Sequence, residues 1–211
     1  MKVLVLGAGG HGQVVADILR SQQAAGEQLR FAGYLDDREG SRHEGGGTVL
    51  GAINQWSSIS HDGVIVAIGD NATRKKRFDE LTAAGARFVT PRHPSTTVAS
   101  EVSIGTGSML CAGVIINTHA WIGVNTIINT GASIDHHCRI GDHVHVAPGV
   151  RLGGNVEVGD GALVGIGAIV LPGTKVGAWS TVGAGAVVTK DVAAGTTVVG
   201  VPARVLTPVG R

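Results

Sequence analysis

The chain has 211 residues, of which 34 are glycine and six are proline. Only 3% of the residues are aromatic, whereas 43% are hydrophobic and 16% are charged. This balance supports a packed core and excludes intrinsic disorder, and the irregular glycine spacing excludes collagen. Seventeen basic and 16 acidic residues give a net charge of +1, so the composition does not indicate a nucleic-acid-binding protein.

The sequence carries no targeting pattern that we recognise. Residues 1–12 run from a few apolar positions directly into glycines, unlike a signal peptide, and no apolar run approaches the ~20 residues that span a bilayer. The two cysteines, Cys111 and Cys138, do not suggest a disulfide framework. We therefore expect a cytoplasmic protein.

Residues 1–92 show alternating strand and helix patterns. A strand over 3–6 runs into Gly7-Ala8-Gly9-Gly10-His11-Gly12 and then into a helix with apolar residues at helical spacing. Further strands are predicted over 31–35, 64–68 and 88–89, with a helix that carries Arg74 and ends at Gly85. This order predicts a small α/β domain with a parallel sheet.

The glycines after the first strand match the spacing of a dinucleotide-binding fingerprint, Gly7-x-Gly9-x-x-Gly12. Backbone amides at the start of the following helix would suit a diphosphate. Because about 90 residues supply only one half of a dinucleotide fold, a site for a single nucleotide is the better interpretation. The alternative is that these glycines only form a tight strand–helix turn.

A six-residue repeat occupies the second part of the chain. Every sixth residue from Val98 to Val188 is Val, Ile or Leu, sixteen positions without an insertion. Short strands joined by tight turns explain this period, with three successive repeats closing one triangular coil. We therefore predict a parallel β-helix over residues 96–206, whose narrow interior has no room for aromatic side chains.

Five of the nine histidines lie between residues 119 and 145. A coil of three repeats places His119 beside His137 on adjacent coils, and likewise Asn125 beside His143. Cys138 falls on an inward-facing small position, where we interpret it as core filler, and His143 is expected to be exposed.

The motifs together resemble one family over nearly the whole chain. The β-helix run, with its closing Gly200-Val201-Pro202-Ala203-Arg204, is similar to the left-handed β-helix of hexapeptide-repeat acyltransferases. The α/β domain in front of it resembles bacterial nucleotide-sugar acetyltransferases of the bacillosamine, perosamine and sialic-acid type. The shared motifs are Gly-Ala-Gly-Gly-His-Gly, Leu35-Asp36-Asp37, Ala67-Ile68-Gly69-Asp70-Asn71 with Arg74, and Asn129-Thr130 leading to Asp135-His136-His137-Cys138.

The resemblance implies transfer of an acetyl group from acetyl-CoA to the 4-amino group of a nucleotide-linked 4-amino-4,6-dideoxysugar. It implies His136 as the general base, a role that suits an imidazole with an ordinary pKa of about 6.5. It further implies a homotrimer with acetyl-CoA sites between subunits, and no metal. The residues implied to contact acetyl-CoA are His145, Ile166 and Ala184, and those implied to contact the nucleotide sugar are Gly9, Gly10, His11, Asp36, Asp37 and Gly69.

One position departs from the family pattern. Where the family places a carboxylate after the catalytic histidine, this chain has His137. His137 cannot supply a negative charge, so the tuning of His136 differs here, with Asn129 as a candidate for orienting its ring.

Three other functions remain compatible with the sequence. An O-acetyltransferase of sialic-acid-like sugars would share the same motifs. A zinc lyase of the γ-carbonic-anhydrase type is also a β-helix, with histidines between subunits, but has no use for the α/β domain. A non-catalytic β-helix scaffold would not need the histidine cluster.

Overall fold

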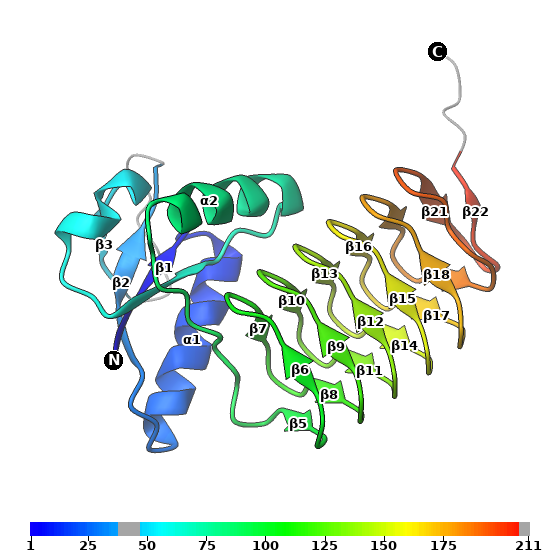
Figure 1. The fold of residues 1–211 in the computed structure, drawn as a ribbon, viewed down its shortest axis with the longest axis horizontal. Coiled ribbons are helices and arrows are strands. Elements are labelled where there is room, and N and C mark those ends of the chain that lie inside the picture. The colour runs from blue at the N-terminus through cyan, green and yellow to red at the C-terminus, as the bar shows by residue number, and fades with distance from the viewer. Residues whose placement is uncertain (38–46, 207–211) are drawn as a thin grey trace, which may run out of the picture.

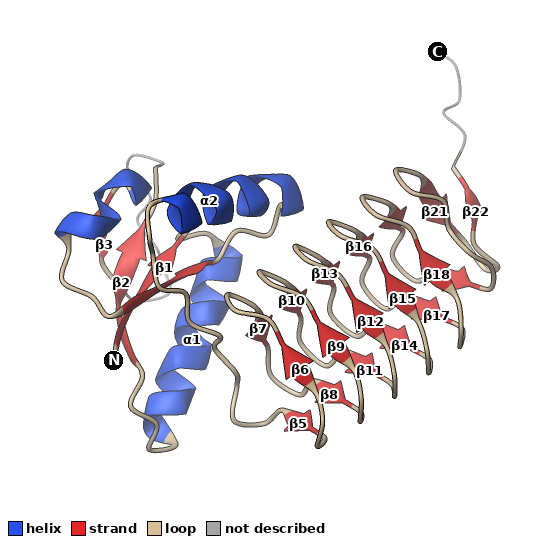
Figure 2. Ribbon diagram, in the orientation of Figure 1, coloured by secondary structure: helices blue, strands red, loops and turns tan. Residues whose placement is uncertain are grey.

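The computed structural model describes residues 1–37 and 47–206. Its chain forms an α/β part followed by a long β-helix that extends away from it (Figures 1 and 2). No helix among these described residues is long and apolar enough to cross a bilayer.

A four-stranded parallel sheet with strand order β3-β2-β1-β4 forms the centre of the α/β part. Its elements are β1 (Lys2–Leu6), α1 (Gly10–Ala24), β2 (Arg30–Leu35), β3 (Val49–Gly51), a 3₁₀ helix η1 (Ile53–Ser58), β4 (Gly63–Val66) and α2 (Asn71–Ala83). The strand predicted over 64–68 is shorter than expected, and the strand predicted over 88–89 is reduced to a single bridge between Val64 and Phe88. The predicted α/β class is confirmed.

Both faces of the sheet are covered, which is why β1 is apolar from Val3 to Leu6. Val3 and Val5 pack in a cluster with Val15 and Leu19 of α1. Leu4 and Leu6 belong to a separate cluster with residues of α2. The two helices therefore cover opposite faces and leave the carboxyl ends of the strands open.

The β-helix is built from three sheets of two- and three-residue strands. The first sheet contains β5 (Thr97–Val98), β8 (Ile115–Ile116), β11 (Ser133–Ile134), β14 (Arg151–Leu152), β17 (Ile169–Val170) and β20 (Val187–Val188). The second contains β6 (Ser103–Ile104), β9 (Trp121–Ile122), β12 (Arg139–Ile140), β15 (Glu157–Val158) and β18 (Lys175–Val176). The third contains β7 (Met109–Leu110), β10 (Ile127–Ile128), β13 (His145–Val146), β16 (Leu163–Val164), β19 (Thr181–Val182), β21 (Thr197–Val199) and β22 (Arg204–Val205).

Strand pairing confirms the predicted coil of three repeats. Ile134 pairs with Ile116 on one side and with Leu152 on the other, in parallel register. The repeated aliphatic side chains fill the interior together with small residues such as Ala132 and Ala162. The first repeat positions, Val98 and Ile104, are only partly buried because no coil precedes theirs.

Each coil turns through residues with positive φ. Glycines occupy the corner between the third and first sheets, at positions 113, 131, 149, 167 and 185. At the other corners several non-glycine residues adopt the left-handed conformation, including His119, His137 and His143 with φ near 59°. These three histidines therefore project from corners of the prism.

A buried arginine joins the two parts of the molecule. Arg74 of α2 is 0% exposed. Its guanidinium donates hydrogen bonds to Asn71 Oδ1 and to the backbone carbonyls of Ile68, Gly69, Asn125, His143 and Val144. Asn71 donates in turn to the carbonyls of Gly161 and Ala162. Burial lowers the pKa of Arg74 to about 9, so the group remains charged at neutral pH.

We expect Arg74→Met to lower the free energy of unfolding by at least about 3 kcal/mol, because several buried carbonyls lose their donor at once. Denaturant unfolding would measure this loss. The matched control is Lys76→Met, which removes a cation from an exposed position of the same helix and should change stability by less than about 0.5 kcal/mol. Equal stability of both variants would contradict the role assigned to Arg74.

Candidate active site

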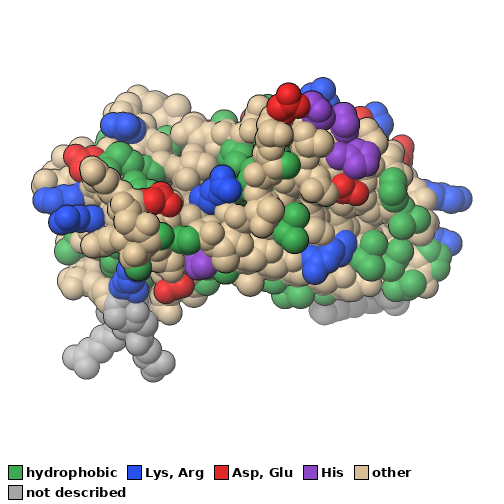
Figure 3. Space-filling view, turned by 90° about the horizontal axis from the view of Figure 1, so that it is seen from below, with side chains coloured by type: hydrophobic (Ala, Val, Ile, Leu, Met, Phe, Trp, Pro, Cys, Tyr) green, Lys and Arg blue, Asp and Glu red, His purple; other side chains and the backbone are tan. Residues whose placement is uncertain are grey.

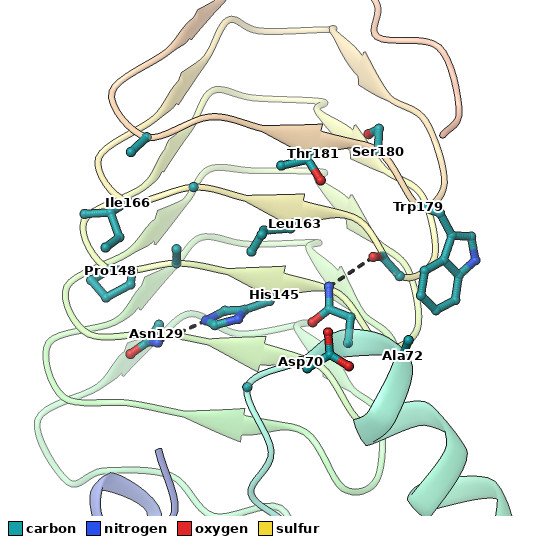
Figure 4. Close-up of a pocket in the computed structure, with 16 residues that line it drawn as sticks. Asp70, Ala72, Asn129, His145, Pro148, Leu163, Ile166, Trp179, Ser180 and Thr181 are labelled. Carbon is teal, nitrogen blue, oxygen red and sulfur yellow. Dashed lines mark hydrogen bonds between the residues drawn. The ribbon is translucent and has the colours of Figure 1, made fainter. Parts of the chain in front are cut away.

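Two of the cavities concern the site, and the first lies on the outer face of the third β-helix sheet, beside the start of α2 (Figure 4). It has a volume of about 740 Å³. Residues from β13, β16, β19 and their corners form its floor, and Asp70, Asn71 and Ala72 form one wall. Asn129, His145, Ile166 and Ala184, which the family resemblance singled out, all line this cavity.

His145 is the main titratable group of the first cavity. The amide nitrogen of Asn129 lies 3.1 Å from Nε2 of His145. Burial, followed by the positive charge of Arg74, lowers the pKa of His145 to about 4. His145 is therefore a neutral imidazole at physiological pH, and it is hydrogen-bonded to Asn129 and to the backbone of Gly69.

The second cavity, of about 470 Å³, opens at the carboxyl ends of β1, β2 and β4. Ligands of open parallel sheets bind at this edge. The lining includes all six residues that the resemblance assigned to the nucleotide sugar, which are Gly9, Gly10, His11, Asp36, Asp37 and Gly69. The structure thus brings these residues together.

Close contacts around the glycine-rich turn fix the shape of the second cavity. A Cβ atom on Gly12 would lie 2.0 Å from the Gly7 carbonyl oxygen, so only glycine allows α1 to start there. Asp36 Oδ2 accepts a hydrogen bond from the Ala8 amide at 2.7 Å. Asp37 is held by the Ile53 amide at 2.8 Å and by Arg77 at 2.6 Å.

The two cavities meet at Gly69, which lines both. His11 of the second cavity lies close to His145 of the first, with ring centroids 6.2 Å apart. Burial, then the charges of His145 and Arg74, lowers the pKa of His11 to about 3. The junction is therefore flanked by two neutral imidazoles.

His136 lies away from this junction. It occupies the corner between the first and second sheets and lines neither cavity. Its Nδ1 lies 3.1 Å from Nδ1 of His137, and the predicted stack of His119 and His137 is present, with ring centroids 4.9 Å apart. Figure 3 shows histidine side chains gathered on this part of the β-helix, beside acidic side chains.

Asn129 and His143 differ from expectation. Asn129 was a candidate for orienting His136, but within the chain its amide contacts His145. The expectation that His143 is exposed is wrong, because Phe78 of α2 covers its ring and the amide of Asn125 is hydrogen-bonded to its Nδ1 at 2.9 Å.

The interpretation of Cys138 as core filler is confirmed, since its side chain is fully buried and burial raises the pKa of its thiol to about 11.

Sequence reasoning missed the structural roles of Arg74 and Asn71. Both belong to a motif shared with the family, but their partners in the β-helix are backbone carbonyls 51 to 91 residues away in sequence, and the local pattern does not reveal such partners. Among the described residues, no group of three or more His, Cys, Asp or Glu side chains is arranged to hold a metal ion.

A β-helix behind an α/β part with a glycine-rich strand–helix turn is the architecture of hexapeptide-repeat transferases, and comparisons with known proteins agree. The model of the PglD N-terminal domain matches residues 2–81, and that of the bacterial transferase hexapeptide (six repeats) matches residues 155–190. UDP-N-acetylbacillosamine N-acetyltransferase of Bacillus subtilis (strain 168) is 36% identical over 114 residues, a match that spans 52% of this chain and about half (51%) of that relative.

Solved structures match along nearly the whole chain. The acetyltransferase domain of PglB from Neisseria gonorrhoeae FA1090 is 34% identical with a TM-score of 0.90, and the match covers 97% of this chain and 99% of that one. GDP-perosamine N-acetyl transferase from Caulobacter crescentus, solved with CoA and GDP-perosamine as a histidine-to-alanine variant, is 36% identical with a TM-score of 0.91 and coverage of 98% and 97%.

The chain belongs to the family of hexapeptide-repeat N-acetyltransferases that act on nucleotide-linked amino sugars. Its β-helix is therefore of the left-handed type, and acetyl-CoA is the co-substrate of the family. This membership favours acetyl transfer over the zinc lyase and the non-catalytic scaffold.

We expect stability to fall as the pH decreases from about 6.5 toward 4. His11 and His145 have folded-state pKa values of about 3 and about 4, below the ordinary 6.5, so in this window the unfolded state binds more protons. Their contribution is fully present above pH 6.5 and is lost as the pH falls. Denaturant unfolding at several pH values would measure the slope.

The slope should be shallower in His145→Asn, which removes one of the two groups. The control His93→Asn removes an imidazole that lines neither cavity and should leave the slope unchanged. An identical pH dependence in wild type and His145→Asn would show that His145 is not held neutral by the fold.

Proposed function

We propose that the protein transfers the acetyl group of acetyl-CoA to the 4-amino group of a nucleotide-linked 4-amino-4,6-dideoxysugar. The observation that carries the proposal is the meeting of two cavities at Gly69. The second cavity contains a glycine-rich strand–helix turn of the kind found in nucleotide sites. The first cavity runs along the corners of successive β-helix coils. Two substrates bound in these cavities would approach each other at their junction.

The second cavity is the proposed site of the nucleotide sugar. Gly9 and Gly10 at the start of α1 would present backbone amides to the diphosphate. Asp36 and Asp37 would lie near the base or ribose, and His11 and Gly69 would face the sugar. The first cavity is the proposed acetyl-CoA site, with His145 beside the thioester and Ile166 and Ala184 along the channel.

His136 is the proposed general base. As the sugar nitrogen attacks the thioester carbonyl, a C–N bond forms and the nitrogen loses a proton to the base. The C–S bond then breaks, CoA leaves as the thiolate, and the proton held by the base converts it to the thiol. His136 lines neither cavity of its own chain. A second copy of the chain would therefore bring its His136 corner to the junction.

This requirement supports a homotrimer, in which cyclic symmetry gives three equal sites. Exposed apolar side chains support association as well, since Ile115 and Ile169 on the first sheet are 46% and 41% exposed. We place the reaction in the cytoplasm, where acetyl-CoA is available. The alternative with a hydroxyl acceptor uses the same two cavities.

A free-thiol assay tests the proposed reaction. CoA release from acetyl-CoA is measured against a panel of UDP-, GDP- and dTDP-linked 4-amino sugars, with matched 4-hydroxy sugars as controls. We expect release only with an amino sugar. Release with a hydroxyl acceptor alone would overturn the assignment in favour of O-acetyl transfer.

Two variants should separate chemistry from binding on the accepted sugar. His136→Ala should lower kcat by about 10²–10⁴, the usual contribution of a general base. Asp36→Asn lies in the second cavity and should raise the KM for the nucleotide sugar with little change in the KM for acetyl-CoA. Loss of CoA binding in both variants would contradict this division.

Mixing two inactive variants tests whether the site is shared between subunits. Co-expressed His136→Ala and His145→Ala chains should regain about a quarter of wild-type activity, since a random trimer pairs an intact His136 with an intact neighbouring His145 at that frequency. Light scattering should show a trimer. No recovery, or a monomer of 21.4 kDa, would contradict the proposed assembly.

A further inference from the structure

We propose that His137 is a positioning residue that fixes the tautomer and ring orientation of His136. In this arrangement Nδ1–H of His136 donates to Nδ1 of His137, so that Nε2 of His136 keeps a free lone pair. His119 and Glu101, on the two preceding coils, hold the ring of His137. The catalytic meaning of this inference rests on the proposed role of His136 as base.

The contact between the two rings carries the inference. Their Nδ1 atoms are 3.1 Å apart and the ring planes are at 83°, so the rings meet edge to face rather than stacking. Between two neutral imidazoles, one nitrogen must donate and the other accept. A base that works through Nε2 must carry its own proton on Nδ1, which makes His137 the acceptor.

The neighbouring carboxylate, Asp135, has other partners. Its Oδ1 accepts the backbone amide of His136 at 2.7 Å and the side-chain amide of Asn117 at 2.8 Å. Asp135 thereby fixes the backbone of the corner, while the ring of His136 contacts His137. His137, the residue after the base, thus orients the His136 ring through a hydrogen bond between neutral groups. A carboxylate at that position would orient the ring through its charge.

A column of corner residues supports His137. Glu101, His119, His137 and Asn155 occupy the same corner of successive coils, and each has φ between 59° and 61°. Nδ1 of His119 lies 3.0 Å from a carboxylate oxygen of Glu101, and its ring packs against His137 with a centroid distance of 4.9 Å. Glu101 therefore orients His119, and His119 restricts the rotation of His137.

The coil that follows restricts His136 from the other side. Gly154 occupies the position of His136 on the next coil, and a Cβ atom there would lie 2.6 Å from Cε1 of the His136 ring. The ring thus lies directly against the backbone of the next coil. Contacts with His137 and Gly154 together define one ring orientation.

Nitrogen-15 NMR of histidine-labelled protein tests the tautomer without reference to catalysis. The two ring nitrogens of His136, assigned with His136→Ala, should show protonated Nδ1 and unprotonated Nε2 at pH 8. In His137→Phe, which keeps a ring for His119 to contact but has no acceptor, this single-tautomer signature should be lost. His137→Asn should keep it, because an amide oxygen can accept and Asn155 shows that asparagine adopts this corner conformation.

Kinetics provide the second readout. His137→Phe should lower kcat by roughly 10- to 100-fold with both KM values unchanged, the range seen when a group that orients a metal-ligating histidine is lost. His137→Asn should recover most of this loss, and His119→Ala should lower kcat in the same direction by less. Unfolding midpoints near the wild-type value would show that the variants are folded.

The outcomes separate the two proposals. A wild-type His136 protonated on Nε2, or a tautomer unchanged in His137→Phe, overturns the inference whatever the activity. If the tautomer responds as expected but His136→Ala keeps full activity, the positioning is correct and the proposed base is wrong. If His137→Asn is as slow as His137→Phe although its tautomer is restored, the hydrogen bond does not serve the reaction.

Discussion

The arrangement of both cavities depends on one buried guanidinium. Arg74 extends from α2 into the interface between the α/β part and the β-helix and contacts backbone carbonyls on both sides. Since the partners of its guanidinium, except Asn71 Oδ1, are all backbone carbonyls, the interaction fixes the position of the main chain itself. One of those partners is Gly69, the residue at which the cavities meet. A displaced Arg74 would therefore change the distance between the two cavities.

The same cation shapes the electrostatics of the junction. None of the hydrogen bonds described above joins Arg74 to a carboxylate. The positive charge of Arg74 therefore disfavours a second positive charge nearby. It adds to burial in keeping His11 and His145 neutral. Neutral imidazoles can accept or donate hydrogen bonds without attracting a counterion, which suits the thioester and the uncharged amine that we propose to meet here.

The sequence predicted the features that follow from short-range periodicity. A strict six-residue repeat has one simple solution, and it correctly placed His119 beside His137, Asn125 beside His143, and Cys138 in the interior. It failed where two parts of the chain pack together. His143 is buried because α2 happens to cover its corner, and the carbonyl partners of Arg74 belong to coils that no local pattern connects with it. Such contacts depend on the relative position of two folded units.

From β5 to β20, paired residues on adjacent coils of the β-helix are 18 residues apart, so the chain can change length by whole coils. Each coil adds about 4.8 Å along the axis and pairs only with the coils before and after it. Duplicating one whole coil beyond Ala184, the last residue in chain order that lines the first cavity, would extend the far end of the prism and leave every contact of the junction in place. The same duplication between His119 and His137 would separate the histidine column and move His145 away from Gly69. Tolerance to whole-coil insertion therefore divides the molecule into a variable end and a segment of fixed length.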